Sequence, residues 1–118
     1  ARFALGDAAG AIEDFSATIR LSPQTTRAYY YRGVVHQQQG RPETALADFS
    51  RCLEYDPYHH DARIARARVY QELGDPEAAL ADGEMVERLD PEHPQLAQLN
   101  IDLGRTTEEP SDETTVRK

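Results

Sequence analysis

The histidines are the residues of this chain whose types and spacing come nearest to a metal site. His59 and His60 are adjacent, Asp61 follows them directly, and His93 lies 34 residues after His59. Imidazole nitrogens and carboxylate oxygens are common metal ligands. Adjacent residues rarely converge on one ion, however, and equivalent loops of neighbouring helix pairs lie about 8–10 Å apart. We therefore expect these side chains to hold no metal, and we predict no cofactor.

No set of residues indicates catalysis. An enzyme needs a nucleophile with its base, two carboxylates in a cleft or a phosphate-binding glycine loop. The acidic pairs Glu13-Asp14 and Glu108-Glu109 are interpreted as solvated charge. Three glycines follow a regular period of 34 residues rather than a phosphate-binding pattern, namely Gly6, Gly40 and Gly74. We therefore predict that the chain is not an enzyme.

The charge balance narrows the class of partner. Lys and Arg total 13 against 21 Asp and Glu, a net charge of −8 at pH 7. A surface that wraps phosphate backbones needs the opposite sign, so we expect no nucleic acid partner.

No apolar run approaches the roughly 20 residues that cross a bilayer, so no membrane partner is expected either. Residues 1–6 contain no initiator Met and no signal peptide, so we expect a fragment of a longer protein and take the cytoplasm only as a default location.

The 34-residue period extends to residue types other than glycine. The columns that share it include three prolines, three alanines and three large apolar residues: Pro23, Pro57, Pro91; Ala11, Ala45, Ala79; Leu21, Tyr55, Leu89. Glycine supplies the backbone freedom that a helix end needs, and proline cannot continue a helix. Each period therefore predicts a helix, a short turn with glycine, a second helix and a stop at proline.

Helix starts are signalled as well. Pro42 and Pro76 stand where the missing N–H has no intrahelical partner in any case, and Asp75 stands where a capping side chain belongs. We expect helices near residues 8–21, 27–39, 42–55, 61–73, 76–89 and 94–103, with ends uncertain by 2–4 residues. No segment alternates in the way of a β-strand.

These columns resemble the tetratricopeptide repeat family, whose 34-residue unit carries Ala, an aromatic residue four positions later, and then Pro. Here the pattern is Ala11, Phe15, Pro23 and again Ala45, Phe49, Pro57. The resemblance implies an all-α fold, a right-handed superhelix of stacked antiparallel helical hairpins. It divides the chain into a truncated first repeat (1–25, mostly its second helix), complete repeats at 26–59 and 60–93, a trailing capping helix (94–104) and a disordered tail or linker (105–118).

The third unit departs from this pattern. Gly83 stands where the other units have Phe, and we expect a side chain of the final helix, such as Leu99, to insert into the space that it leaves. The position usually given to Trp holds Tyr29 and then Arg63. Cys52, the single cysteine, occupies a core column and is interpreted as a small buried residue rather than a reactive thiol.

The resemblance also implies a function, because the first helices of stacked repeats line a concave groove that binds protein segments. A 3-4-3 spacing puts two sets of residues on one face of two successive first helices: Arg27, Tyr30, Val34, Gln37 and Asp61, Ile64, Arg68, Gln71. The final helix adds Gln95, Gln98 and Asp102. Apolar anchors beside Arg suit a protein or peptide with acidic and apolar groups.

Alternatives stay open. Tyr30, Val34 and Ile64 are also compatible with simple packing between helices. Some family members hold the carboxylate of a chaperone tail with Lys, Asn and Arg at fixed positions. The corresponding residues here supply neither Lys nor Asn: Tyr30, Tyr31, Val34, Asp61 and Ala65.

A second hypothesis is a spacer or self-association element, in which an apolar edge formed by Ile12, Phe15 and Ile19 makes a homodimer.

Overall fold

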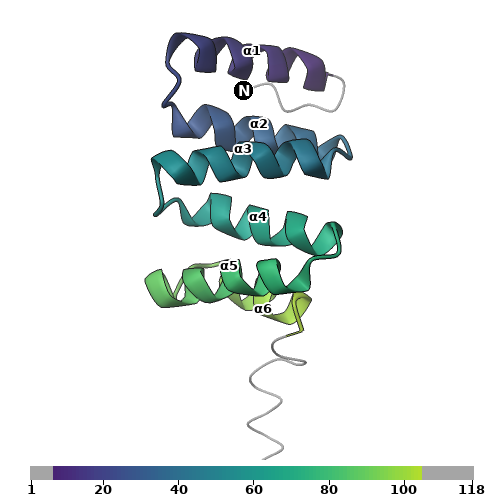
Figure 1. The fold of residues 1–118 in the computed structure, drawn as a ribbon, viewed down its shortest axis with the longest axis vertical. Coiled ribbons are helices and arrows are strands. Elements are labelled where there is room, and N and C mark those ends of the chain that lie inside the picture. Colours follow the sequence, from purple (N-terminus) through teal and green to yellow (C-terminus); the bar gives the residue numbers. More distant parts are fainter. Residues whose placement is uncertain (1–6, 105–118) are drawn as a thin grey trace, which may run out of the picture.

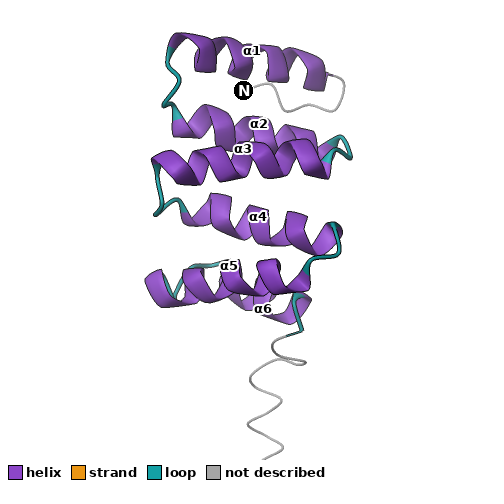
Figure 2. Ribbon diagram, viewed as in Figure 1, coloured by secondary structure: helices purple, strands orange, loops and turns teal. Residues whose placement is uncertain are grey.

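The computed structural model describes residues 7–104, and that range consists of α-helices and turns without a β-strand (Figure 2). The helices are α1 (Ala8–Leu21), α2 (Thr26–Gln38), α3 (Pro42–Tyr55), α4 (His60–Glu72), α5 (Pro76–Leu89) and α6 (Leu96–Asp102). The predicted helices and the all-α class are confirmed, with helix ends displaced by no more than two residues. The predicted tail at 105–118 lies outside the described residues. None of the helices in the described range is long and apolar enough to cross a membrane.

The helices stack side by side in chain order (Figure 1). Helices α2 and α3 form one hairpin and α4 and α5 the next, while α1 packs on α2 and α3 packs on α4. Helix α6 lies against both α4 and α5. The first helices α2, α4 and α6 are therefore successive neighbours, which is the condition for a continuous surface across repeats.

Local chemistry explains where the helices begin and end. Proline opens α3 and α5, and the Asp75 carboxylate caps α5 by accepting the Ala78 N–H over 3.2 Å. The His59 Nδ1 atom caps α4 in the same way, accepting the Ala62 N–H over 3.1 Å. The turns after α2 and α4 contain Gly40 and Gly74 at φ 75° and 81°, a left-handed conformation that favours glycine.

The first core cluster joins α2, α3 and α4 around Phe49, which is fully buried. Its buried members are Tyr29, Ala45, Phe49, Cys52, Leu53, Ala62 and Val69. Gly33 allows α2 to approach this ring, since a Cβ atom built on Gly33 would lie 2.7 Å from Phe49 Cε1. Close packing of the first full hairpin thus depends on a glycine facing an aromatic ring.

The second core cluster holds α6 on the last hairpin. Its buried members are Ile64, Ala67, Val86, Leu96 and Leu99, with Leu103 packed against them. A Cβ atom built on Gly83 would lie 3.3 Å from Leu103 Cδ1 and 3.7 Å from Leu99 Cδ2. The prediction that a side chain of the final helix fills the space at Gly83 is confirmed, and two leucines rather than one do so.

A polar contact that the sequence reasoning missed recurs in the α2–α3 hairpin and in the α4–α5 hairpin. The Arg32 guanidinium donates to both Asp48 carboxylate oxygens over 2.9 and 2.7 Å and to Ser16 Oγ over 3.0 Å. One repeat later, the Arg66 guanidinium donates to both oxygens of Asp82 over 2.8 Å and to Ser50 Oγ over 3.3 Å. Each guanidinium therefore ties a first helix to the second helix of its own repeat and to that of the preceding repeat.

Candidate functional site

We call the residues Arg27, Tyr30, Val34 and Gln37 of α2 together with Asp61, Arg68 and Gln71 of α4 the first-helix face. On α2, Arg27 is exposed, and Tyr30, Val34 and Gln37 are partly buried. Tyr30 and Val34 also pack against the first core cluster. Within residues 7–104 the Arg27 guanidinium has neither an ion-pair nor a hydrogen-bond partner. The α2 half of this surface thus offers one cation beside partly exposed apolar groups.

Tyr30 is the centre of a group of rings on this half. Its ring centroid lies 5.0 Å from that of Tyr31, 4.9 Å from that of His59 and 5.9 Å from that of Phe49. The Tyr31 ring in turn stacks on Phe15 of α1 at 6.0 Å. Burial, followed by the Asp61 charge, raises the pKa of the Tyr30 hydroxyl, which stays neutral and able to donate a hydrogen bond.

The α4 half of the face is tied to the chain that follows it. Arg68 Nη1 donates to Asp102 Oδ2 over 2.6 Å, and the Gln71 amide donates to the Asp102 main-chain oxygen over 2.6 Å. The Asp102 carboxylate also accepts from the Gln98 amide over 2.9 Å. The hydrogen bond from Arg68, and then that from Gln98, lower the pKa of Asp102. These polar groups therefore hold α6 in place.

The prediction that Ile64 lies on the open surface is wrong. Its side chain is 1% exposed and belongs to the second core cluster beneath α6. The 3-4-3 spacing puts Ile64 on the same side of α4 as Arg68, but the leucines of α6 cover it. Ile64 positions the last two first helices relative to each other and is not available to a partner.

The histidines come closer together than loop spacing alone predicts. The His93 Nε2 atom and Asp61 Oδ1 form a hydrogen bond of 2.8 Å, and the His60 and His93 ring centroids are 6.4 Å apart. His59 is used as a helix cap, and His93 Nδ1 accepts the Gln95 N–H over 3.1 Å. Across residues 7–104, no three His, Cys, Asp or Glu side chains are placed to share one metal ion.

Comparison with known proteins identifies the family of the segment that carries this geometry. Residues 17–69, which span α2 and α3 and most of α4, match the family model of the tetratricopeptide repeat. This segment of the chain belongs to the tetratricopeptide repeat family. No curated protein matches the chain.

Several solved structures share the fold at low sequence identity. The first tetratricopeptide repeat domain of Spaghetti (RPAP3), bound to the HSP90 peptide SRMEEVD, is 17% identical with a TM-score of 0.79, over 85% of this chain and 79% of that one. A tetratricopeptide repeat protein from Parabacteroides merdae is 18% identical with a TM-score of 0.77; the alignment covers 83% of this chain but 38% of that protein. The Yersinia enterocolitica type III secretion translocator chaperone SycD is 18% identical, with a TM-score of 0.73, over 85% and 69% of the two chains. At these identities the likeness shows an all-α helical repeat solenoid.

The hairpin of α4 and α5 repeats the arrangement of the preceding one, but it carries an arginine at the position where the tetratricopeptide repeat family usually has Trp. The Arg63 side chain is 12% exposed; its Nη2 atom donates to the Pro57 carbonyl over 2.6 Å, and its Nη1 atom lies 3.8 Å from Asp82 Oδ1. The Nε atom is buried without a hydrogen-bond partner. Burial lowers the pKa of Arg63. This repeat therefore places a cation where the preceding one buries Tyr29.

Cys52 has the structural role that its column predicts. Its side chain is fully buried in the first core cluster. Burial, with a further contribution from the Asp56 charge, raises the pKa of the Cys52 thiol to about 12. The thiolate needed for nucleophilic chemistry is thus disfavoured in the folded protein.

Proposed function

We propose that this tetratricopeptide repeat chain is a non-catalytic scaffold that binds a segment of another protein across the first-helix face. The observation that supports this proposal best is the α2 half, where the unpaired guanidinium of Arg27 lies one helical turn from the partly exposed Tyr30 ring. Tyrosine and arginine are the side chains enriched at protein interfaces and at their energetic centres. The polar α4 half, already joined to α6, extends the surface rather than anchoring the partner.

The chemistry of the face favours a segment with apolar and acidic groups. Tyr30 and Val34 offer apolar surface, the Arg27 guanidinium suits a carboxylate, and the neutral Tyr30 hydroxyl suits a carbonyl oxygen. The Spaghetti domain binds an HSP90 peptide that combines acidic residues with Met and Val. This chain lacks Lys and Asn at the corresponding clamp positions, so we propose an internal segment of a partner rather than a chaperone tail.

A peptide selected against the chain tests this proposal. Peptides from a random phage-displayed library would be selected on the wild-type chain, and the best binder synthesised and titrated by fluorescence anisotropy. We expect Arg27→Glu and Tyr30→Ala each to weaken binding at least tenfold, because they remove the unpaired cation and the central ring. Arg51→Glu on α3 is the matched control, since Arg51 is also exposed but lies on a second helix. Equal affinities for all four proteins would contradict the proposal.

Self-association through α1 is the second candidate function. It is favoured by a difference in solvent exposure between residues of α1 and the equivalent residues of α3. Phe15 and Ile19 remain partly exposed, whereas Phe49 and Leu53, one repeat later, are buried. Leu21 at the end of α1 is 87% exposed. We propose that a second copy covers this edge, in which case the chain is a spacer or assembly element and substitutions on the first-helix face have no effect.

Light scattering over a range of concentrations separates the two candidates. Self-association predicts a mass that rises above the 13.3 kDa of the monomer, and it predicts that Leu21→Glu restores the monomer. Leu21 is so exposed that this change leaves the core intact. A constant monomer mass would reject the dimer while leaving the peptide-binding proposal untouched.

A further inference from the structure

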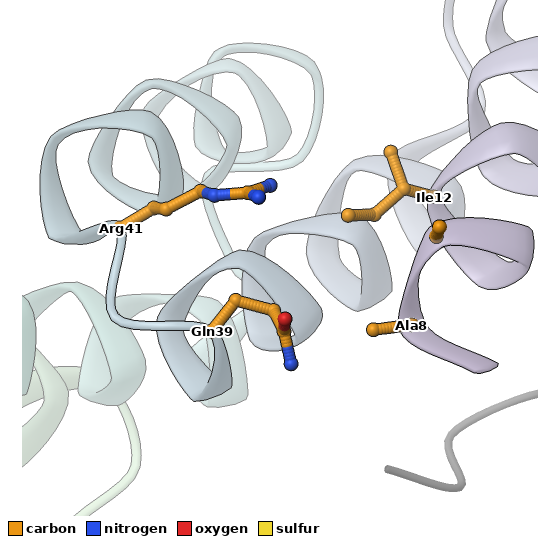
Figure 3. A pocket seen from close by; sticks show the side chains of 5 residues that line it. Ala8, Ile12, Gln39 and Arg41 are labelled. Atoms are coloured by element: carbon orange, nitrogen blue, oxygen red, sulfur yellow. The ribbon is translucent and has the colours of Figure 1, made fainter. Parts of the chain in front are cut away.

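A pocket of about 220 Å³ lies between the start of α1 and the turn that joins α2 to α3. Its walls are Ala8, Ala9 and Ile12 of α1 on one side and Gln39 and Arg41 of the turn on the other (Figure 3). The Arg41 and Gln39 side chains extend across the gap toward Ile12 and Ala8 (Figure 3). None of these residues belongs to the first-helix face, so the pocket is a separate feature of the molecule.

The pocket coincides with a departure from the repeat. Thirty-four residues after Gln39 stands Leu73, and thirty-four after Ile12 stands Leu46. Leu46 and Leu73 both pack against the first core cluster. A leucine at position 39 would fill the equivalent space with hydrocarbon, and filling an apolar void is ordinarily stabilising. Position 39 instead carries the polar Gln39 side chain, which lines the pocket.

Arg41 is a second departure at the same place. Its equivalent, Asp75, caps α5 through the Ala78 N–H at 3.2 Å, whereas Arg41 precedes α3 without any side-chain cap. A cation at a helix start is also opposed by the helix dipole. Within residues 7–104 the Arg41 guanidinium has no hydrogen-bond or ion-pair partner. Two neighbouring positions thus hold residues less favourable for stability than those found one repeat later.

Both departures make the pocket suitable for a ligand that combines an apolar group with a negatively charged group. The wall formed by Ala8, Ala9 and Ile12 is hydrocarbon, while Gln39 and Arg41 offer N–H donors at the opposite side. A cavity of about 150 Å³ is enough for a benzene molecule, so this pocket has room for one branched aliphatic side chain. Residues that are unfavourable for local structure and bring no compensating contact often occupy functional positions.

We propose that this pocket binds a partner protein through an aliphatic side chain, Leu or Ile, that is followed by an Asp or Glu carboxylate. The aliphatic group packs on the α1 wall, and the carboxylate pairs with the Arg41 guanidinium and the Gln39 amide. The proposal does not depend on the first-helix face. The two surfaces together would allow one partner to be held at two points, which raises affinity without new contacts at either.

An NMR titration with three small probes tests the site. The probe is the acetylated dipeptide amide Leu-Glu, with Ala-Glu and Leu-Gln as matched controls that lack the aliphatic group or the charge. We expect Leu-Glu to shift the backbone amides of Ala9, Ile12 and Gln39 with a Kd on the order of 1 mM, in the range open to a ligand of this size. Both controls should bind at least fivefold more weakly. Identical shifts with all three probes, or none at these amides, would overturn the proposal.

Two variants, each with the residue found 34 positions later, provide a further test of the site. Gln39→Leu introduces the residue found at position 73 and should abolish the Leu-Glu shifts while raising the melting temperature. Arg41→Asp introduces the capping residue found at position 75 and should also abolish them without loss of stability. Retained binding by either folded variant would count against the site.

A third variant separates this pocket from the first-helix face. Arg27→Glu, which disables only that face, should bind the dipeptide like wild type, so the two proposals fail separately. A shift of the pocket amides that depends on protein concentration alone would instead show a second copy as the occupant and reject a partner segment.

Discussion

Arg32 and Asp48, sixteen residues apart in the chain, form a two-point contact of 2.7 and 2.9 Å between the helices of one hairpin. The Asp48 side chain is 6% exposed and that of Arg32 is 22% exposed. The paired geometry supplies both oxygens of this buried carboxylate with charged hydrogen-bond donors. The same contact joins Arg66 and Asp82 in the next repeat. It is a structural element of the repeat and not part of the proposed binding surface.

Asp48→Ala is predicted to lower the free energy of unfolding by about 2–3 kcal/mol, because it leaves the partly buried Arg32 guanidinium without its two carboxylate acceptors. Urea denaturation followed by circular dichroism measures this change. Glu54→Ala is the control, since it breaks the solvent-exposed contact between Arg51 and Glu54 and should change stability by about 0.5 kcal/mol or less. Similar losses for both variants would show that the buried pair has no special role.

Gly33 and Gly83 are predicted to respond differently to alanine. At Gly33 the new methyl group would lie 2.7 Å from the Phe49 ring, and overpacking of this kind lowers stability by about 1–3 kcal/mol. At Gly83 the nearest atom is the flexible Leu103 Cδ1 at 3.3 Å, and the helix preference of Ala, about 1 kcal/mol, offsets the crowding. Thermal unfolding of the two variants should therefore show a clear loss for Gly33→Ala and little change for Gly83→Ala.

The Cys52 thiol is predicted to resist modification in the native protein. Its side chain is fully buried, and its pKa of about 12 leaves almost no thiolate at pH 8. Reaction with Ellman's reagent should be slow in buffer and rapid in denaturing urea. An added thiol in the Ala47→Cys variant, at an exposed position on α3, should react at once in buffer. Fast labelling of Cys52 in the folded wild type would contradict the described core.

His36 is predicted to make stability depend on pH. Burial, opposed by the Asp48 charge, holds the pKa of His36 below its ordinary value of 6.5. The unfolded chain then binds more protons than the folded one between the lowered pKa and 6.5, so stability is highest above pH 6.5 and falls as the pH drops through this window. In His36→Tyr, which introduces the residue found 34 positions later, the decrease in melting temperature between pH 7 and pH 5 should be smaller. An unchanged slope would exclude His36 as its source.

The sequence was sufficient for the helices because their signals are local. Pro42 and Pro76 set helix starts, Gly40 and Gly74 set the turns, and the recurring alanines fix the faces that pack. The 34-residue period also includes the residues of the Arg–Asp contacts. These are Arg32 and Arg66, Asp48 and Asp82, and Ser16 and Ser50. Those columns could have been found in the same way as the prolines.

The surface was harder to predict because its exposure depends on what packs over it. The spacing on α4 assigns Ile64, Arg68 and Gln71 to one side of the helix, but it contains no information about the position of α6. Once α6 is docked, Ile64 is buried and the two polar residues bind Asp102. The difference between Gln39 and Leu73 was visible in the sequence, yet only the structure shows that Gln39 lines a pocket.

Chemical-shift mapping of the selected peptide on the isotope-labelled chain tests the central claim most directly. If the chain binds partners across its first-helix face, the largest backbone shifts will fall on α2 at Arg27, Tyr30, Val34 and Gln37, and the second helices α3 and α5 will change little. Shifts confined to α3, α5 or the edge of α1, with α2 unaffected, would contradict the assignment of this face as the binding surface.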